Sequence, residues 1–284
     1  MKILLTGANG QVGYELERSL QAVGEVIAAR REELDLSDLD AVRAMVGAVR
    51  PHLSVNAAGY TAVDQAESEP DLAYRINAEA PAVMAAEAKL LGAAMVQFST
   101  DYVFDGAKQG AYLETDPPNP INVYGRSKLA GEQAVIAAGI DHLILRTGWV
   151  YGMRGKNFLQ TMLRLGRERE QLRVVCDQTG ASTWSCTLAD CTALILGQVR
   201  AGRPSWWQRH SGLYHLTCTG STSWCGFTDA IVAAAGLPCR VLPISSAEYP
   251  VAARRPSNSS LDCGKIASLC HLPDWRAALA LCMG

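Results

Sequence analysis

Residues 6–13 have the sequence Thr6-Gly7-Ala8-Asn9-Gly10-Gln11-Val12-Gly13 and directly follow the short apolar run 3–6. Glycines at this Gly-x-x-Gly-x-x-Gly spacing allow a tight turn and a close approach of the backbone, so a pyrophosphate can bind the amides that begin the next helix. A turn that merely needs positive φ is the alternative. Because the glycines follow the first strand directly, they predict a dinucleotide-binding turn.

Outward from this turn, short apolar runs alternate with amphipathic segments. The runs 26–29, 53–56, 94–99 and 142–146 have the length of buried strands, and the segments 11–21, 38–49, 71–91 and one beginning near Tyr124 have the period of helices. Strands that alternate with helices form parallel sheets. The expected fold is therefore α/β, with a doubly wound Rossmann-type parallel sheet.

The pattern loosens after Trp149 and suggests a second, smaller α/β lobe. We expect helices at 158–169 and 187–199, strands at 172–175 and 213–216, a polar break at 200–212, and a helix after the Ser221-Thr222-Ser223 cap. The proposed division is a dinucleotide-binding domain at 1–150, which also receives segments from about 176–216, and a mainly substrate-binding lobe at 151–284.

Composition excludes several classes of function. The 284 residues carry a net charge of −2, which gives no field to gather nucleic acid or an acidic membrane. No apolar run approaches the roughly 18–20 residues that span a bilayer, so no membrane partner and a cytoplasmic location are expected. The nine cysteines form no Cys-x-x-Cys pair and predict neither a disulfide framework nor a zinc site.

The second strand lacks the acid that takes the ribose 2′-hydroxyl of NAD and ends instead in Arg30-Arg31. Two guanidinium groups there either meet the 2′-phosphate of NADPH or are solvated loop charges, so NADPH is favoured and NADH stays possible. Asp35 and Leu36 have the spacing to line the adenine pocket. Small side chains at Ala57, Ala58 and Gly59 let the cofactor lie close to the end of the third strand.

A candidate catalytic group combines Thr100, at the end of the fourth strand, with Tyr124 and Lys128 on the next helix. The tyrosine and the lysine are four residues apart and share one helical face. A phenol has a pKa of about 10, and a nearby ammonium would favour its phenolate. Thr100 or Ser99 could hydrogen-bond a substrate oxygen as hydride arrives. A surface Tyr-Lys pair is the alternative.

Five segments together resemble the dTDP-4-dehydrorhamnose reductase family of the extended short-chain dehydrogenase superfamily: Leu5-Thr6-Gly7-Ala8-Asn9-Gly10-Gln11-Val12-Gly13, Asn56-Ala57-Ala58-Gly59-Tyr60-Thr61-Ala62-Val63-Asp64, Ser99-Thr100-Asp101-Tyr102-Val103-Phe104, Asn122-Val123-Tyr124-Gly125 and Arg146-Thr147-Gly148-Trp149-Val150-Tyr151. The resemblance extends to about Asp190 and returns at Arg255-Pro256-Ser257-Asn258-Ser259-Ser260-Leu261. It implies reduction of the 4-keto group of dTDP-4-dehydro-L-rhamnose to dTDP-L-rhamnose, a nucleotide sugar for polysaccharides such as lipopolysaccharide O-antigen.

The resemblance also implies roles for individual residues. Tyr124 would donate the proton, Lys128 would be its partner and bind the ribose, and Thr100 would polarise the ketone. Cofactor contacts would come from Gly10, Gln11, Val12, Gly59, Tyr60 and Thr61, beside Gly7 and Gly13 of the turn. Asp101, Tyr102 and Trp149 would line the sugar pocket, and Arg255 would take the nucleotide pyrophosphate.

The sequence departs from the family where some members pair subunits through magnesium. Glu15 stands at one such position, but Cys186 and Arg276 stand at the later ones and cannot form an oxygen site for a hard cation. We therefore expect no metal site, with Glu15 a weak candidate and magnesium doubtful, and a monomer or homodimer. The pair Trp206-Trp207 is either an exposed contact surface or packed against its own lobe.

Two other functions compete with the reductase. A non-catalytic NADP-binding subunit, like the regulatory β subunit of methionine adenosyltransferase, resembles the same family, but it has no reason to keep Thr100, Tyr124 and Lys128 together. A sugar-nucleotide epimerase or dehydratase also uses a Tyr-Lys pair. Dehydratases carry an acid doublet after the strand-end threonine, whereas here Asp101-Tyr102 follows.

Overall fold

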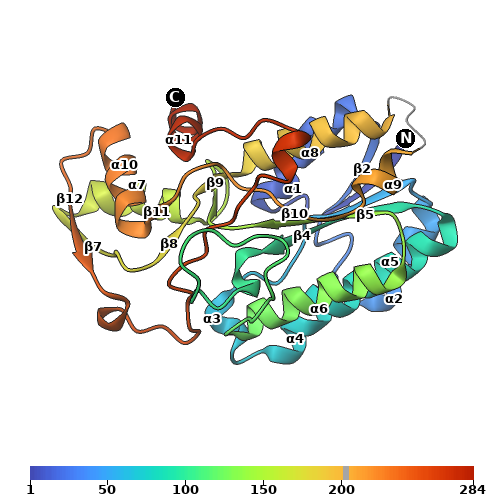
Figure 1. Cartoon of the computed structure of the whole chain (residues 1–284), viewed down its shortest axis with the longest axis horizontal. Coiled ribbons are helices and arrows are strands. Elements are labelled where there is room, and N and C mark those ends of the chain that lie inside the picture. Colours follow the sequence, from blue (N-terminus) through green and yellow to red (C-terminus); the bar gives the residue numbers. More distant parts are fainter. Residues whose placement is uncertain (201–204) are drawn as a thin grey trace.

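A six-stranded parallel sheet forms the centre of the computed structural model, which describes residues 1–200 and 205–284 (Figure 1). Its strands, in spatial order, are β10 (Gly212–His215), β5 (His142–Thr147), β4 (Ala94–Thr100), β3 (Leu53–Asn56), β1 (Lys2–Thr6) and β2 (Glu25–Ala29). The chain runs from β1 outward to β2 and then crosses to β3 on the other side of β1. The carboxyl end of β1 therefore lies at the switch point where doubly wound sheets bind ligands.

Alternating side chains on the strands bury two faces under two layers of helices (Figure 1). Ile3 and Leu5 pack under α1 (Gln11–Ser19) and α8 (Ser185–Arg200), whereas Leu4 packs on the opposite face. That opposite layer contains α2 (Leu39–Val49), α5 (Ala80–Leu91) and α6 (Val123–Ala138), with the short α3 (Val63–Ala66) and α4 (Pro70–Tyr74) beside them. Both faces of the sheet are covered, as the apolar strands require.

A second core lies beyond one end of this sheet. Its helices are α7 (Phe158–Glu168), α10 (Trp224–Ala234) and α11 (Trp275–Met283), which bury Tyr151, Phe227 and Trp275 among them. Three strand pairs frame it: parallel β7 (Gln171–Val175) with β12 (Arg240–Ile244), antiparallel β8 (Thr179–Gly180) with β11 (Thr222–Ser223), and parallel β6 (Val150–Tyr151) with β9 (Thr183–Trp184).

The predicted fold class and helices are confirmed, with three refinements. The helix expected at 71–91 contains a π-helix at Arg75–Glu79. The polar break expected at 200–212 contains the short helix α9 (Trp206–His210), and its residues 201–204 lie outside the described part. Trp206 is buried in the first core with Trp207 against it, so this pair packs inward. In the described part of the chain, no helix has the length and apolarity that crossing a bilayer demands.

Candidate active site

The glycine turn after β1 has a geometry that only glycine permits. Gly7 has φ +78°, and a Cβ atom added at Gly13 would lie 2.0 Å from the carbonyl oxygen of Gly7. Helix α1 begins at Gln11 after Gly10, which has no side chain to cap the helix. No side-chain cap therefore accepts hydrogen bonds from the first backbone amides of α1. The buried Oε1 of Gln11 also has no hydrogen-bond partner among the described residues. The backbone amides and the space around them fit a dinucleotide pyrophosphate, whereas the Gln11 Oε1, an acceptor, suits a donor group of a ligand.

A cavity of about 610 Å³ extends from this turn to the carboxyl end of β4. It brings together most of the predicted site residues, although they come from separate strands and helices. Its lining includes Gly7, Gly10, Gln11, Val12, Asp35, Leu36, Ala57, Ala58, Gly59, Thr61, Thr100, Asp101, Tyr102, Tyr124, Lys128 and Trp149. The dinucleotide-binding turn and the candidate catalytic group therefore line the same cavity.

The two neighbouring arginines at the end of β2 are separated by the structure. Arg31 lines the cavity next to Leu34 and Asp35, with its guanidinium 3.7 Å from the Asp35 carboxylate. The Arg30 guanidinium lies instead 3.1 Å from Glu17 on α1 and is not among the lining residues. Of the two arginines that the sequence analysis named, Arg31 and not Arg30 is thus placed to meet an adenosine phosphate.

Three other predicted residues are not among those that line the cavity. Gly13 supports the turn from within α1. The Tyr60 hydroxyl donates to Glu69 over 2.7 Å, and burial raises the pKa of this phenol to about 12. Arg255 donates to the Asp64 carboxylate over 2.7 Å and to the Ala253 carbonyl, so its charge is already paired. For these residues the structure shows a supporting position, and their expected ligand contacts stay predictions.

Tyr124 and Lys128 lie in the first two turns of α6, where Lys128 is buried and Tyr124 is half-buried. Asn122 begins this helix by accepting the Gly125 amide over 2.7 Å. A Cβ at Gly125 would lie 2.1 Å from the Tyr102 carbonyl oxygen, so glycine lets α6 touch the segment after β4. This contact sets the phenol of Tyr124 beside the Thr100 hydroxyl.

The electrostatics of this pair differ from the expectation that an ammonium lowers the pKa of the phenol. Burial raises the pKa of Tyr124 to about 12, outweighing the lowering influence of the neighbouring Thr100 hydroxyl, and the charge of Asp101 adds to the rise. Burial lowers the pKa of Lys128 to about 8, against the charge of Glu132. Lys128 Nζ donates 2.6 Å to the Phe98 carbonyl rather than to the phenol. Tyr124 therefore retains its proton at neutral pH.

A buried ion pair supports the strand end from behind. Glu132 lies one turn beyond Lys128 on α6 and accepts two hydrogen bonds from Arg146 of β5, at 2.8 and 2.6 Å. The same carboxylate accepts the Ser99 hydroxyl over 2.5 Å. Both ion-pair side chains are at most 4% exposed. Ser99, one of the two candidates to bind the substrate oxygen, is thus held by Glu132, which leaves Thr100.

Asp101 is buried beside Thr100, whose hydroxyl donates to its Oδ1 over 3.0 Å. Burial raises the pKa of this carboxyl to about 6, against the lowering influence of the Ser259 and Thr100 hydroxyls. Its Oδ2 has no hydrogen-bond partner among the described residues and belongs to a cavity-lining side chain. An unpartnered buried carboxylate oxygen suits a ligand hydroxyl.

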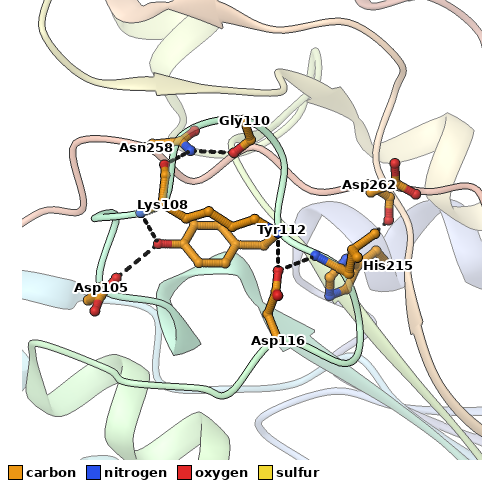
Figure 2. A network of polar contacts seen from close by, with 9 residues as sticks. Asp105, Lys108, Gly110, Tyr112, Asp116, His215, Asn258 and Asp262 are labelled. Atoms are coloured by element: carbon orange, nitrogen blue, oxygen red, sulfur yellow. Dashed lines mark hydrogen bonds and ion pairs between the residues drawn. The ribbon is translucent and has the colours of Figure 1, made fainter.

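Hydrogen bonds hold the segment around Asn258, next to Ser259, against the loop 105–112 that follows β4 (Figure 2). Tyr112 donates its hydroxyl to Asp105 over 2.9 Å and accepts the Lys108 amide. Asn258 donates to the Lys108 and Gly110 carbonyls at 2.8 and 2.7 Å. Residues far apart in sequence therefore meet at the carboxyl end of β4.

Sequence reasoning missed two groups at this site. Asn77, in the π-helix, holds the Gly59–Tyr60 loop by accepting the Tyr60 amide over 2.8 Å and donates to Ser127 on α6 over 3.0 Å. A π-helix at a functional site is the structural signal, which a sequence pattern does not reveal. Trp224 stacks on Trp149 with ring centroids 3.5 Å apart and also lines the cavity. Trp149 has φ +50°, and Gly180 leaves room for its indole.

Glu15 has one acidic neighbour among the groups that influence its pKa. Burial raises the pKa of its carboxyl, with Arg18, Asp190 and Arg154 nearby. In residues 1–200 and 205–284, no cluster of three or more histidine, cysteine or acidic side chains could hold a metal ion. The expectation that no magnesium binds at Glu15 stays a prediction.

A Tyr-Lys pair on one helix face, directed at the space in front of a dinucleotide turn, is the arrangement of Rossmann-type oxidoreductases of the short-chain dehydrogenase class. Within that class the chain belongs to the family described as RmlD substrate binding domain, whose model matches residues 1–284.

Characterised relatives and solved structures agree with this membership. The chain is 50% identical to a dTDP-4-dehydrorhamnose reductase of Burkholderia thailandensis, over 100% of this chain and 98% of the relative. It is 43% identical to one from Escherichia coli, over 98% and 96%. A crystal structure of dTDP-4-dehydrorhamnose reductase from Bacillus anthracis in complex with NADP superimposes with TM-score 0.90 at 38% identity, covering 99% and 98% of the two chains. A Thermus thermophilus UDP-glucose 4-epimerase, 21% identical with TM-score 0.82, shares the fold.

Proposed function

We propose that this chain reduces the 4-keto group of dTDP-4-dehydro-L-rhamnose to dTDP-L-rhamnose with NADPH. One observation carries the proposal: the glycine turn, Arg31, Thr100, Tyr124 and Lys128 all line a single cavity. The names of the full-length relatives and the NADP-bound neighbour support the same substrate and cofactor.

The bound dinucleotide would supply the hydride. Tyr124, protonated because burial raises its pKa to about 12, donates its phenolic proton to the developing alkoxide. Thr100 lies beside Tyr124 and would hydrogen-bond the same oxygen by turning its hydroxyl away from the Asp101 carboxylate, to which it donates over 3.0 Å. Lys128 stands near Gly59, where an added Cβ would be 3.7 Å from Nζ, and its remaining ammonium hydrogens would bind the ribose and stabilise the phenolate that proton donation leaves.

The substrate's sugar would face Asp101, Tyr102 and the Trp149–Trp224 stack. Arg31 would bind the 2′-phosphate of NADPH, and Asp35 and Leu36 would face the adenosine. Arg255 is already paired with Asp64, so it would bind the nucleotide pyrophosphate only by exchanging that partner.

The regulatory-subunit alternative predicts a bound NADP without turnover, and the intact catalytic group disfavours it. The test is NADPH oxidation at 340 nm with enzymatically generated dTDP-4-dehydro-L-rhamnose, for the wild type and for Tyr124→Phe. We expect Tyr124→Phe to lower kcat about 10²–10⁴-fold while NADPH affinity is unchanged. Near-normal turnover in Tyr124→Phe would refute the role of this phenol, and NADPH binding without turnover in the wild type would favour the regulatory subunit.

A further inference from the structure

Two cysteines meet beside the aromatic wall of the cavity. Cys176 follows β7, and Cys225 is the second residue of α10. Between them, β8 and β11 pair antiparallel with Ser223 opposite Thr179, which brings the residues before β8 next to those after β11. Cys176 Sγ lies 3.9 Å from Ser223 Oγ, and only Trp224 separates Ser223 from Cys225 in the chain. Cys176 is close enough to contribute to the raised pKa of the Cys225 thiol.

The surroundings distinguish this pair from the other cysteines. Cys176 is the exposed one of the nine, and Cys225 is buried directly behind it. Burial raises the pKa of the Cys225 thiol to about 11, so it stays protonated and an external reagent reaches Cys176 first. Cys191 and Cys270 also contact each other, but both are buried and out of reach of such a reagent.

The same two segments hold a wall of the active site. Trp224 immediately precedes Cys225, and its Nε1 donates 3.2 Å to Gln178, two residues after Cys176. Its indole stacks on Trp149, and Phe158 packs against it with ring centroids 4.4 Å apart. A covalent link between Cys176 and Cys225 would therefore restrict the movement of Trp224 against Trp149.

We propose that Cys176 and Cys225 form an oxidisable thiol pair whose disulfide fixes the Trp149–Trp224 wall and weakens binding of the sugar nucleotide. With glutathione disulfide as the oxidant, Cys176 attacks one sulfur and releases one glutathione thiol. Cys225 then displaces the second glutathione as a thiol, so two protein thiols are oxidised to one S–S bond while one glutathione disulfide is reduced to two thiols.

The effect on substrate binding rests on the proposed function, whereas formation of the bond does not. Purified enzyme is treated with glutathione disulfide, digested and mapped by mass spectrometry, with Cys176→Ser as the test variant and Cys270→Ser as the matched buried control. We expect a Cys176–Cys225 bridge in the wild type and in Cys270→Ser, and none in Cys176→Ser. A glutathione adduct that persists on Cys176 while Cys225 stays free would overturn the pairing.

Kinetics and ligand binding test the consequence. We expect oxidation to raise the KM for the sugar nucleotide and the Kd for dTDP, followed by tryptophan fluorescence, at least several-fold. The NADPH Kd should not change, and dithiothreitol should restore the original values. An oxidised, bridged enzyme with an unchanged Kd for dTDP would refute control of the wall. Because thiol mapping and dTDP binding need no turnover, failure of the reductase assay alone is distinguishable from failure of this inference.

Discussion

Replacement of Glu132 by glutamine is expected to damage both stability and the active site. The change leaves the Arg146 guanidinium buried without its counter-charge, and its Nη1 already lacks a partner among the described residues. Removing one member of a buried ion pair costs about 3–5 kcal/mol. For a chain somewhat smaller than this one, each kcal/mol of lost stability lowers the Tm by roughly 2–4 °C, so the apparent Tm should fall by about 6–20 °C.

Scanning calorimetry and the pH profile of kcat/KM would measure these effects. Glu168→Gln removes the exposed partner of Arg164 and is the matched control, expected to cost no more than about 1 kcal/mol. Glu132 also raises the pKa of Lys128, so the alkaline limb that reports the ammonium should move to lower pH in Glu132→Gln. If Glu132→Gln melts within the range of Glu168→Gln and its pH profile does not move, the reasoning is refuted.

Three further predictions concern individual charges. Lys128→Met should abolish turnover yet raise the Tm at pH 7. The folded pKa of Lys128, about 8, lies below the usual value of 10.5, so the buried ammonium lowers the stability of the wild type until pH rises through that interval. An equal Tm difference between variant and wild type at pH 7 and at pH 10 would contradict this. Asp101→Asn should be more stable than the wild type at pH 7. The folded pKa of Asp101 is raised to about 6, so the wild type has a stability contribution from the protonated carboxyl that is lost as pH rises through this value. Calorimetry should therefore show the difference between variant and wild type shrink as pH falls from about 6 toward 4, and a constant difference would show that ionisation is not responsible. Arg31→Ala should raise the KM for NADPH about tenfold or more while the KM for NADH changes little. Arg30 pairs with Glu17, so Arg30→Ala should change neither KM in steady-state assays. Equal changes for both cofactors in Arg31→Ala would show that Arg31 does not recognise the phosphate.

Local signals carried most of the fold and part of the site. The Gly7 to Gly13 spacing and the i, i+4 relation of Tyr124 and Lys128 are short-range features, so the sequence displays them directly. The choice between Arg30 and Arg31 depended instead on Glu17, a residue on another element that captures one guanidinium. Asn77 contacts Tyr60, which lies 17 positions away in the sequence, and Trp224 contacts Trp149, which lies 75 positions away. No sequence periodicity predicts such contacts.

The direction of the Tyr124 shift was missed for a similar reason. Spacing indicates that an ammonium stands near a phenol, but desolvation depends on how completely surrounding elements exclude water. Here that burial dominates and raises the pKa. The Lys128 ammonium is turned toward the Phe98 carbonyl, which only the three-dimensional position of β4 determines.

The edge strand β10 and the packing of Ile266, Leu269 and Leu272 into the first core have a consequence for biosynthesis. A nascent chain emerges from its amino end, so the glycine turn is made before the apolar residues that complete the layer beneath it. The cofactor pocket should acquire native affinity only after these later residues have left the ribosome. Until β10 has been made, the exposed edge of β5 needs protection from pairing with other chains.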